Sequence, residues 1–305
     1  MWNMRISAAL AVMLLTTSSG AAISCGSADI QKSKPPARVI SNKAEPGASQ
    51  ESGLKVLASG PHAGMTDPFV ALARDAETYR ALTELSANLP KLDEDFFKSN
   101  AVLAVFLGTR STGGYSVEIA RAESGEIRVA EKRPPKDAMV TQVITSPFKL
   151  VAVPIDERTP LIITLDTAWE QKMRPYEVTS GQFTMSGGFA GRVEEFPLRG
   201  KVRVMRVGGL ATFSFSLEGS SRRRHRSLSE VATGIVKSSR AITIHKLGAG
   251  SLIDPPHSGL MAEGGFSQGG KRLSLKFTSL PSMIADGFSG EGSIVARTSG
   301  RAPKP

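Results

Sequence analysis

Apolar positions in residues 53–155 predict one helix and several strands. Asp75 is suited to cap the start of the helix, and Pro90 to stop it. Apolar residues recur between them every three or four positions and so share one helical face: Tyr79, Leu82, Leu85 and Leu89. The run AVLAVFLG (101–108) is continuously apolar, as in a strand buried on both faces.

Three further runs in this region have strand character. YSVEIARAE and EIRVAEKRP alternate apolar with polar residues, and VTQVITSPFKLVAVPI is apolar but interrupted at Pro147, where a bulge or an edge is expected. The expected fold of residues 53–155 is therefore α+β, with one helix on a mainly antiparallel sheet.

Residues 156–305 read as a succession of strands separated by glycine-rich turns. Alternation is clear at Phe213, Phe215 and Leu217, and the runs are PLIITLDTA, GQFTMSGGFAGR, GKVRVMRVGG, ATFSFSLEG, RAITIHKLG, RLSLKFTSLP and EGSIVARTS. Many short strands at near-regular spacing predict an all-β sandwich or barrel. The chain as a whole is expected to be mainly β.

The first residues have the features of an export signal. Arg5 supplies a positive charge, an apolar run follows from Ile6 to Leu15, and small residues follow that. The run is shorter than the ~20 residues of a membrane-spanning helix, which favours a signal peptide over residues 1–24.

Cys25 follows the small residues directly, as the last residue of Ala22-Ile23-Ser24-Cys25. This tetrapeptide resembles a bacterial lipobox, in which the cysteine is lipidated. The alternative is ordinary signal cleavage near Ala22. Residues 25–52 are poor in large apolar side chains and are expected to form a flexible linker.

The excess positive charge lies in the second half of the chain. The net charge is +10, yet residues 53–155 hold 12 basic and 12 acidic residues, whereas residues 156–305 hold 21 basic and 13 acidic residues. This change supports a domain boundary between residues 155 and 156.

Several motifs of the first region occur in the order of a known family. They are Asp95-Phe96-Phe97, an apolar strand ending in Gly108, Ser111-Thr112-Gly113-Gly114-Tyr115-Ser116-Val117, Pro134-Pro135, and Thr141-Gln142-Val143-Ile144-Thr145-Ser146-Pro147-Phe148. Residues 55–155 thus resemble the PrcB C-terminal domain, a family named for a lipoprotein subunit of a bacterial surface protease complex. The resemblance implies an accessory role in which the domain contacts or stabilises a partner protein.

The segment Thr112-Gly113-Gly114-Tyr115 has two interpretations. Its glycines permit positive φ or close approach of another backbone. A partner could therefore dock against this backbone with Tyr115 as an anchor. Alternatively, the segment is a hairpin turn with a core tyrosine.

A second candidate site is the basic cluster Arg222, Arg223, Arg224 and Arg226. Such a cluster suits an anionic surface such as lipid headgroups or polysaccharide. The alternative is a solvated loop between strands. Aromatic residues for base stacking are missing from this cluster, so no nucleic acid is expected as a partner.

Candidate catalytic chemistry is sparse. The lone cysteine cannot form an intramolecular disulfide, and the four histidines form no HExxH pair, so neither a zinc site nor a cofactor is expected. Ser251, Asp254 and His257 lie close in sequence, but no GxSxG motif accompanies them.

These features together predict a non-enzymatic, lipid-anchored envelope protein, facing the periplasm or the cell surface, that binds an exported protein. A protease is one candidate partner. Alternatives are an envelope protein that holds an apolar ligand in the second domain, an envelope hydrolase, and a secreted or periplasmic soluble location.

Overall fold

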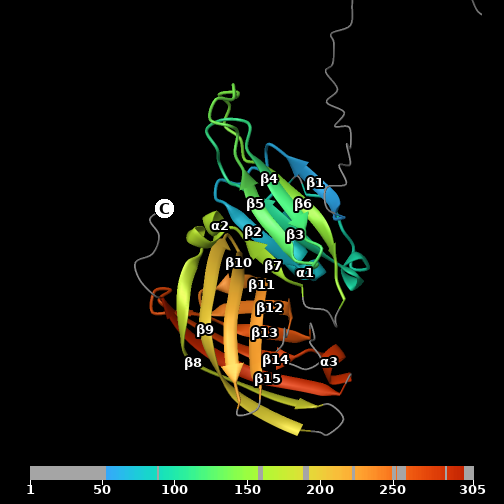
Figure 1. The fold of residues 1–305 in the computed structure, drawn as a ribbon, viewed down its shortest axis with the longest axis vertical. Coiled ribbons are helices and arrows are strands. Elements are labelled where there is room, and N and C mark those ends of the chain that lie inside the picture. The colour runs from blue at the N-terminus through green and yellow to red at the C-terminus, as the bar shows by residue number, and fades with distance from the viewer. Residues whose placement is uncertain are drawn as a thin grey trace, which may run out of the picture. The chain divides into compact units, whose positions relative to one another are not determined.

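The computed structural model confirms a mainly β protein and identifies the second region as a closed barrel rather than a sandwich (Figure 1). The structure describes residues 53–87, 89–156, 161–187, 192–221, 224–248, 252, 259–285 and 287–298. The predicted signal peptide and linker, and with them Cys25, lie outside these residues, as do Arg222, Arg223, Ser251, Asp254 and His257.

The first region is built on a four-stranded antiparallel sheet in the order β1-β6-β3-β2. Its strands are β1 (Lys55–Gly60), β2 (Phe69–Ala73), β3 (Asn100–Phe106) and β6 (Phe148–Pro154). Strand β3 lies between two neighbours and is buried throughout from Ala101 to Phe106. The continuously apolar run therefore marks a strand buried on both faces, as expected.

Helix α1 (Ala76–Thr83) begins as predicted but ends early. Asp75 caps it by accepting a hydrogen bond from the backbone N–H of Thr78 (2.8 Å). The apolar spacing predicted a helix that continues to Leu89. Instead, the Ser86 hydroxyl donates to the carbonyl of Ala63 (2.6 Å), a tertiary hydrogen bond formed where the chain has left the helix.

A second, three-stranded sheet completes the first region, in the order β4-β5-β7. Strands β4 (Ser116–Arg121) and β5 (Ile127–Lys132) form a hairpin, and β7 (Ile163–Leu165) runs parallel to β5. Helix α2 (Thr167–Lys172) follows β7, with Trp169 fully buried, and a short 3-10 helix, η1 (Phe96–Lys98), precedes β3. Both β7 and α2 come after residue 155, yet their apolar side chains belong to the core of the first region.

The barrel has eight antiparallel strands that neighbour one another in sequence order and close where β15 pairs with β8. Its strands are β8 (Arg174–Gly187), β9 (Arg192–Val207), β10 (Leu210–Ser220), β11 (His225–Ser238), β12 (Ala241–Leu247), β13 (Leu260–Ser267), β14 (Arg272–Ser279) and β15 (Phe288–Thr298). A short helix, α3 (Pro281–Ala285), connects β14 to β15. Closure pairs every strand on both sides and so leaves no free sheet edge.

Aromatic side chains fill the barrel interior. The predicted alternation on β10 is confirmed, because Phe213, Phe215 and Leu217 are buried while Ser216 and Glu218 are exposed. Five phenylalanines of this core are each at most 1% exposed: Phe183, Phe196, Phe213, Phe215 and Phe277. An eight-stranded barrel is just wide enough for such side chains to fill it. This packing gives the apolar-ligand alternative no support.

The barrel wall covers the open edge of strand β2. The Thr233 hydroxyl accepts a hydrogen bond from the backbone N–H of Leu72 (2.8 Å), and the Thr212 hydroxyl donates to the carbonyl of Val70 (2.5 Å). These two hydroxyls occupy positions that a further strand would otherwise take. The first region and the barrel accordingly belong to one compact unit.

A buried ion pair joins the same two surfaces. Arg74, directly after β2, contacts Glu230 of β11, and the two side chains are 2% and 3% exposed. Burial raises the pKa of Glu230, and the charge of Arg74 opposes this effect. We call Arg74, Glu230, Thr212 and Thr233 the junction.

Candidate protein-binding site

The two family-like motifs of the first region lie against each other. The backbone N–H of Gly113 donates to the carbonyl of Thr141 (2.9 Å), and the Thr145 hydroxyl donates to the carbonyl of Thr112 (3.1 Å). Arg110 and Thr145 exchange two backbone hydrogen bonds, of 2.7 and 2.9 Å. The loop before β4 and the loop before β6 therefore form one unit.

The two glycines permit this close approach. A Cβ atom at Gly113 would lie 2.4 Å from the Thr141 hydroxyl oxygen. Gly114 has a φ of +85°, and a Cβ atom there would lie 2.9 Å from Pro134. The chain's own residues thus occupy the space beside the glycines, and docking of a partner on Thr112, Gly113 and Gly114 stays a prediction.

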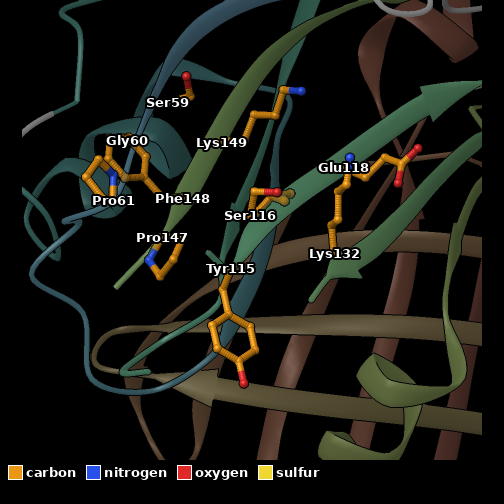
Figure 2. Close-up of a pocket in the computed structure, with 11 residues that line it drawn as sticks. Ser59, Gly60, Pro61, Tyr115, Ser116, Glu118, Lys132, Pro147, Phe148 and Lys149 are labelled. Carbon is orange, nitrogen blue, oxygen red and sulfur yellow. The ribbon is translucent and has the colours of Figure 1, made fainter. Parts of the chain in front are cut away.

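Tyr115 is half-buried at the margin of a pocket of about 390 Å³ (Figure 2). The pocket is lined by parts of β1, β4, β5 and β6 and the loops beside them, including Gly60, Ser116 and Phe148. Figure 2 shows the Tyr115 ring directed away from Ser59 and Lys149. The Arg110 guanidinium lies 5.5 Å from the centre of this ring. Tyr115 is thus a packed, partly accessible side chain.

Three large apolar side chains are exposed in the loop between β5 and β6. Met139 is fully exposed, Ile144 is 69% exposed and Val143 is 54% exposed. We call these three residues the loop tip. The loop projects beyond the ends of the strands that it connects (Figure 1). Clustered exposed apolar side chains mark interaction sites more often than scattered ones do.

The sequence analysis placed Val143 in a strand, and that expectation is wrong. Strand β6 begins only at Phe148, and residues 141–144 have no regular structure. The β-branched side chains of Val143 and Ile144 suggest a strand, but neither residue pairs with a strand in the part of the chain that the structure describes; the nearest pairing is the isolated bridge of Thr145 with Arg110. The exposure of the loop tip therefore could not be read from its residue types.

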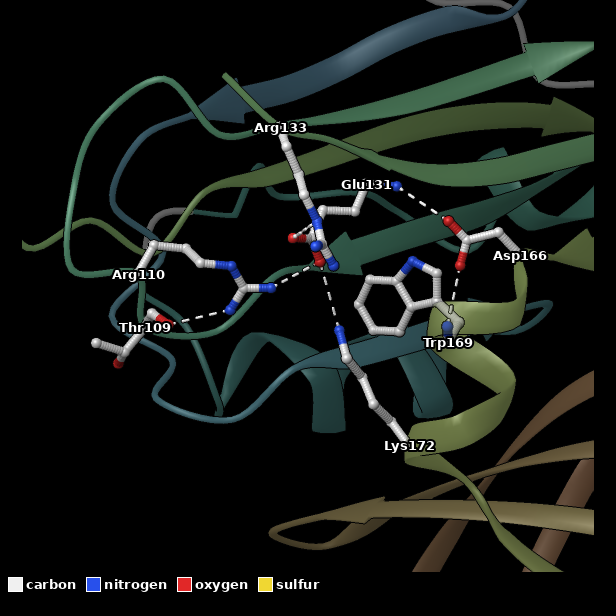
Figure 3. Close-up of polar contacts among 7 residues, drawn as sticks. All are labelled: Thr109, Arg110, Glu131, Arg133, Asp166, Trp169 and Lys172. Carbon is white, nitrogen blue, oxygen red and sulfur yellow. Dashed lines mark hydrogen bonds and ion pairs between the residues drawn. The ribbon is translucent and has the colours of Figure 1, made fainter. Parts of the chain in front are cut away.

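A cluster of charges holds the base of this loop unit (Figure 3). Glu131, near the end of β5, accepts a hydrogen bond from Arg110 Nη2 (2.8 Å) and pairs with Arg133 Nε (3.2 Å). Lys172 of α2 approaches the same carboxylate at 3.5 Å and lies 4.4 Å from the centre of the Trp169 ring. The side chain of Glu131 is only 5% exposed, so these contacts are poorly screened by water.

These contacts determine the pKa of Glu131. Burial alone would raise its pKa, but the hydrogen bond and charge of Arg110, together with Lys172 and Arg133, hold the pKa below its ordinary value. Burial lowers the pKa of Lys172, while the charge of Glu131 opposes this effect. Glu131 is therefore an ionised carboxylate, and it holds the Arg110 side chain at the base of the paired loops.

Asp166 connects this cluster to helix α2. One of its carboxylate oxygens accepts from the backbone N–H of Trp169 (3.0 Å), which caps the helix, and the other accepts from the backbone N–H of Glu131 (3.4 Å). A helix of six residues is too short to give a periodic pattern, so the sequence analysis did not find it.

Replacing Glu131 with glutamine is expected to lower the free energy of unfolding by about 2–3 kcal/mol at pH 7, because charged hydrogen bonds at this depth are lost. Because the pKa of Glu131 is lowered in the folded state, its ionised form stabilises the fold above the unfolded pKa of about 4.3. This stabilisation is lost as the pH falls. The difference between the two proteins should shrink below about pH 4. Urea unfolding across this pH range measures it. Exposed Glu123→Gln is the control, and an equal effect of both substitutions would contradict the role of Glu131.

The structure describes two of the four arginines of the predicted basic cluster, Arg224 and Arg226. The Arg226 side chain is 6% exposed and pairs with Glu194 at 3.1 Å. Glu194 also accepts from the Ser221 hydroxyl (2.6 Å), and this bond, together with Arg226, lowers its pKa although burial opposes the change. Arg226 thus lies against a carboxylate of its own chain, while Arg224 is exposed. Contact of the cluster with an anionic surface stays a prediction.

Among the described residues, no group of three or more His, Cys, Asp and Glu side chains is arranged to hold a metal ion. The helices in the part of the chain that the structure describes are too short or too polar to cross a membrane.

The fold and this site define a two-part β protein whose first part carries paired loops with an exposed apolar tip. The model of the PrcB C-terminal family matches residues 101–154, from β3 to the end of β6, and so includes both paired loops. This match confirms the resemblance inferred from the motifs. A search of curated proteins found no match to the chain.

Proposed function

We propose that this chain is a non-enzymatic, lipid-anchored envelope protein that binds another exported protein through the loop tip. The observation that carries the proposal is the exposure of Met139, Val143 and Ile144 on one loop within the family-like residues. A protease is one candidate partner, because the family takes its name from a subunit of a protease complex. Cys25 provides the anchor in this proposal.

The energetics of the loop tip favour binding. Burying a large apolar side chain contributes about 1.5–3 kcal/mol, so three together suit the apolar centre of an interface. The base of the loop unit is already ordered by Glu131, Arg110 and the Gly113–Thr141 hydrogen bond. Binding to a pre-ordered loop loses less conformational entropy than binding to a flexible one.

Affinity capture from solubilised envelope tests the partner. The triple variant Met139→Asp, Val143→Asp, Ile144→Asp should recover a specific exported partner at least tenfold less than the unmodified protein does, on the order expected for loss of an interface centre. The matched control places aspartate at three exposed apolar positions elsewhere: Ile162, Val193 and Ile284. Equal recovery by the two triple variants would contradict the proposed site.

The anchor has an independent test. Cys25→Ser removes the thiol that would carry the lipid, and several buried acyl chains each contribute about 0.8 kcal/mol per CH₂ to membrane attachment. The variant should move from the membrane fraction to the soluble fraction of the envelope. An unchanged distribution on fractionation would refute lipid anchoring but leave the loop tip untouched.

A further inference from the structure

Three arginines outside the predicted basic cluster line one pocket at an end of the barrel. Arg174 begins β8, Arg206 lies near the end of β9, and Arg240 lies in the turn between β11 and β12. The pocket has a volume of about 380 Å³, and its lining is completed by Ser239 and by residues 266–270, at the end of β13 and in the turn after it.

Two of the guanidinium groups are positioned by aromatic rings. Arg206 lies 4.9 Å from the centre of the Phe266 ring, and Arg174 lies 5.8 Å from that of Tyr176. The two rings contact each other at 6.0 Å, and the Tyr176 hydroxyl donates to the carbonyl of Gly270 (2.8 Å). The two cations are therefore held on one connected framework.

The positive charge of this pocket is not balanced. No aspartate or glutamate is among the described residues that line it. Arg206 and Arg240 are exposed, whereas Arg174 is half-buried. Arg174 Nε is buried and has no hydrogen-bond partner among the described residues, and the same is true of Arg226 Nε. Arg226, however, pairs with Glu194 through Nη2, while Arg174 forms no ion pair in the part of the chain that the structure describes. A buried charged donor without a partner is costly, and a bound anion would satisfy it.

We propose that this pocket binds a phosphate group. Guanidinium groups donate two parallel hydrogen bonds to phosphate oxygens, and a tetrahedral dianion offers enough acceptors for several arginines at once. A single carboxylate has too few oxygens and too little charge for three guanidinium groups. The glutamine side chain of Gln268, which also lines the pocket, adds a neutral donor.

The phosphate group has two chemical sources, a soluble phosphate compound and a phospholipid headgroup. The proposal concerns barrel residues only and does not rest on the loop tip. Failure of either proposal therefore leaves the other standing.

Isothermal titration of the full-length, detergent-solubilised protein with inorganic phosphate and with pyrophosphate, at low ionic strength, tests the site. We expect saturable binding that Arg174→Gln and Arg206→Gln each weaken at least tenfold, as for loss of charged hydrogen bonds. Arg199→Gln is the matched control, because Arg199 is exposed on β9 and its loss changes the net charge equally. Thermal unfolding of each variant checks that the barrel is intact.

Flotation of the Cys25→Ser protein, which lacks the proposed lipid anchor, with vesicles of phosphatidylcholine, with and without phosphatidic acid, distinguishes the sources. Flotation that depends on phosphatidic acid and that Arg206→Gln abolishes supports a headgroup, whereas titration without such flotation supports a soluble compound. The proposal is overturned if neither probe binds saturably, or if Arg199→Gln weakens binding as much as Arg206→Gln does.

Discussion

Replacing Arg74 with alanine is expected to lower the free energy of unfolding by about 3–5 kcal/mol, because Glu230 would remain buried without its counter-charge. Both side chains are almost completely buried between β2 and the barrel wall. The adjacent hydrogen bonds of Thr233 and Thr212 hold the same sheet edge, so the loss should loosen the contact of the two regions as well. Chemical unfolding followed by circular dichroism measures the change.

Two further variants distinguish the loss of the ion pair from the general effect of removing an arginine. Arg80→Ala removes an exposed arginine from the nearby helix α1 and should change stability by less than about 0.5 kcal/mol. The double variant Arg74→Met, Glu230→Leu should recover most of the loss, since apolar replacement of both partners removes the unpaired charge. A double variant less stable than Arg74→Ala alone would contradict this account.

Phe215→Ala is expected to destabilise the protein by a similar amount, about 3–5 kcal/mol, by leaving a cavity in the barrel core. Phe215 contacts Phe213 in a stacked geometry at 5.9 Å and Phe277 edge-on at 6.1 Å. The neighbouring rings belong to a closed barrel and cannot fully collapse into the space. Thermal and urea unfolding provide the measurement.

Phe215→Ala also tests whether the barrel interior is a packed core or a cavity that holds a ligand. If the interior is a packed core, Phe215→Ala lowers stability, and a small apolar molecule such as benzene restores part of it by filling the new space. Val193→Ala, at an exposed position on β9, should have little effect. A Phe215→Ala protein as stable as the unmodified chain would contradict a packed interior.

Local patterns predicted the elements whose signals lie within a few residues. The cap at Asp75, the buried strand β3 and the alternation on β10 each depend on neighbouring positions, and each is confirmed. Turns and alternation also predicted strands after residue 155, but they could not decide between a sandwich and a barrel. That choice depends on the pairing of β15 with β8, the last strand of the barrel with the first.

The candidate site and the junction depend on contacts that no local pattern shows. Arg74 and Glu230 are separated by 156 positions, and nothing near either residue marks it as buried. The motifs around Gly113 and Thr141 were recognised from their order, which correctly pointed to one region. Their mutual hydrogen bonding and the exposure of Met139 are properties of the folded chain that the sequence did not show.

Contact between the loop tip and an exported partner can be tested in the cell. The most direct measurement is photo-crosslinking in intact cells, with a photo-reactive amino acid in place of Met139 and, in a parallel protein, in place of Ile284 on α3. We expect a specific crosslinked product with an exported protein from position 139 and none from position 284. The same product from both positions, or none from position 139 in cells that stably express the protein, would contradict this contact.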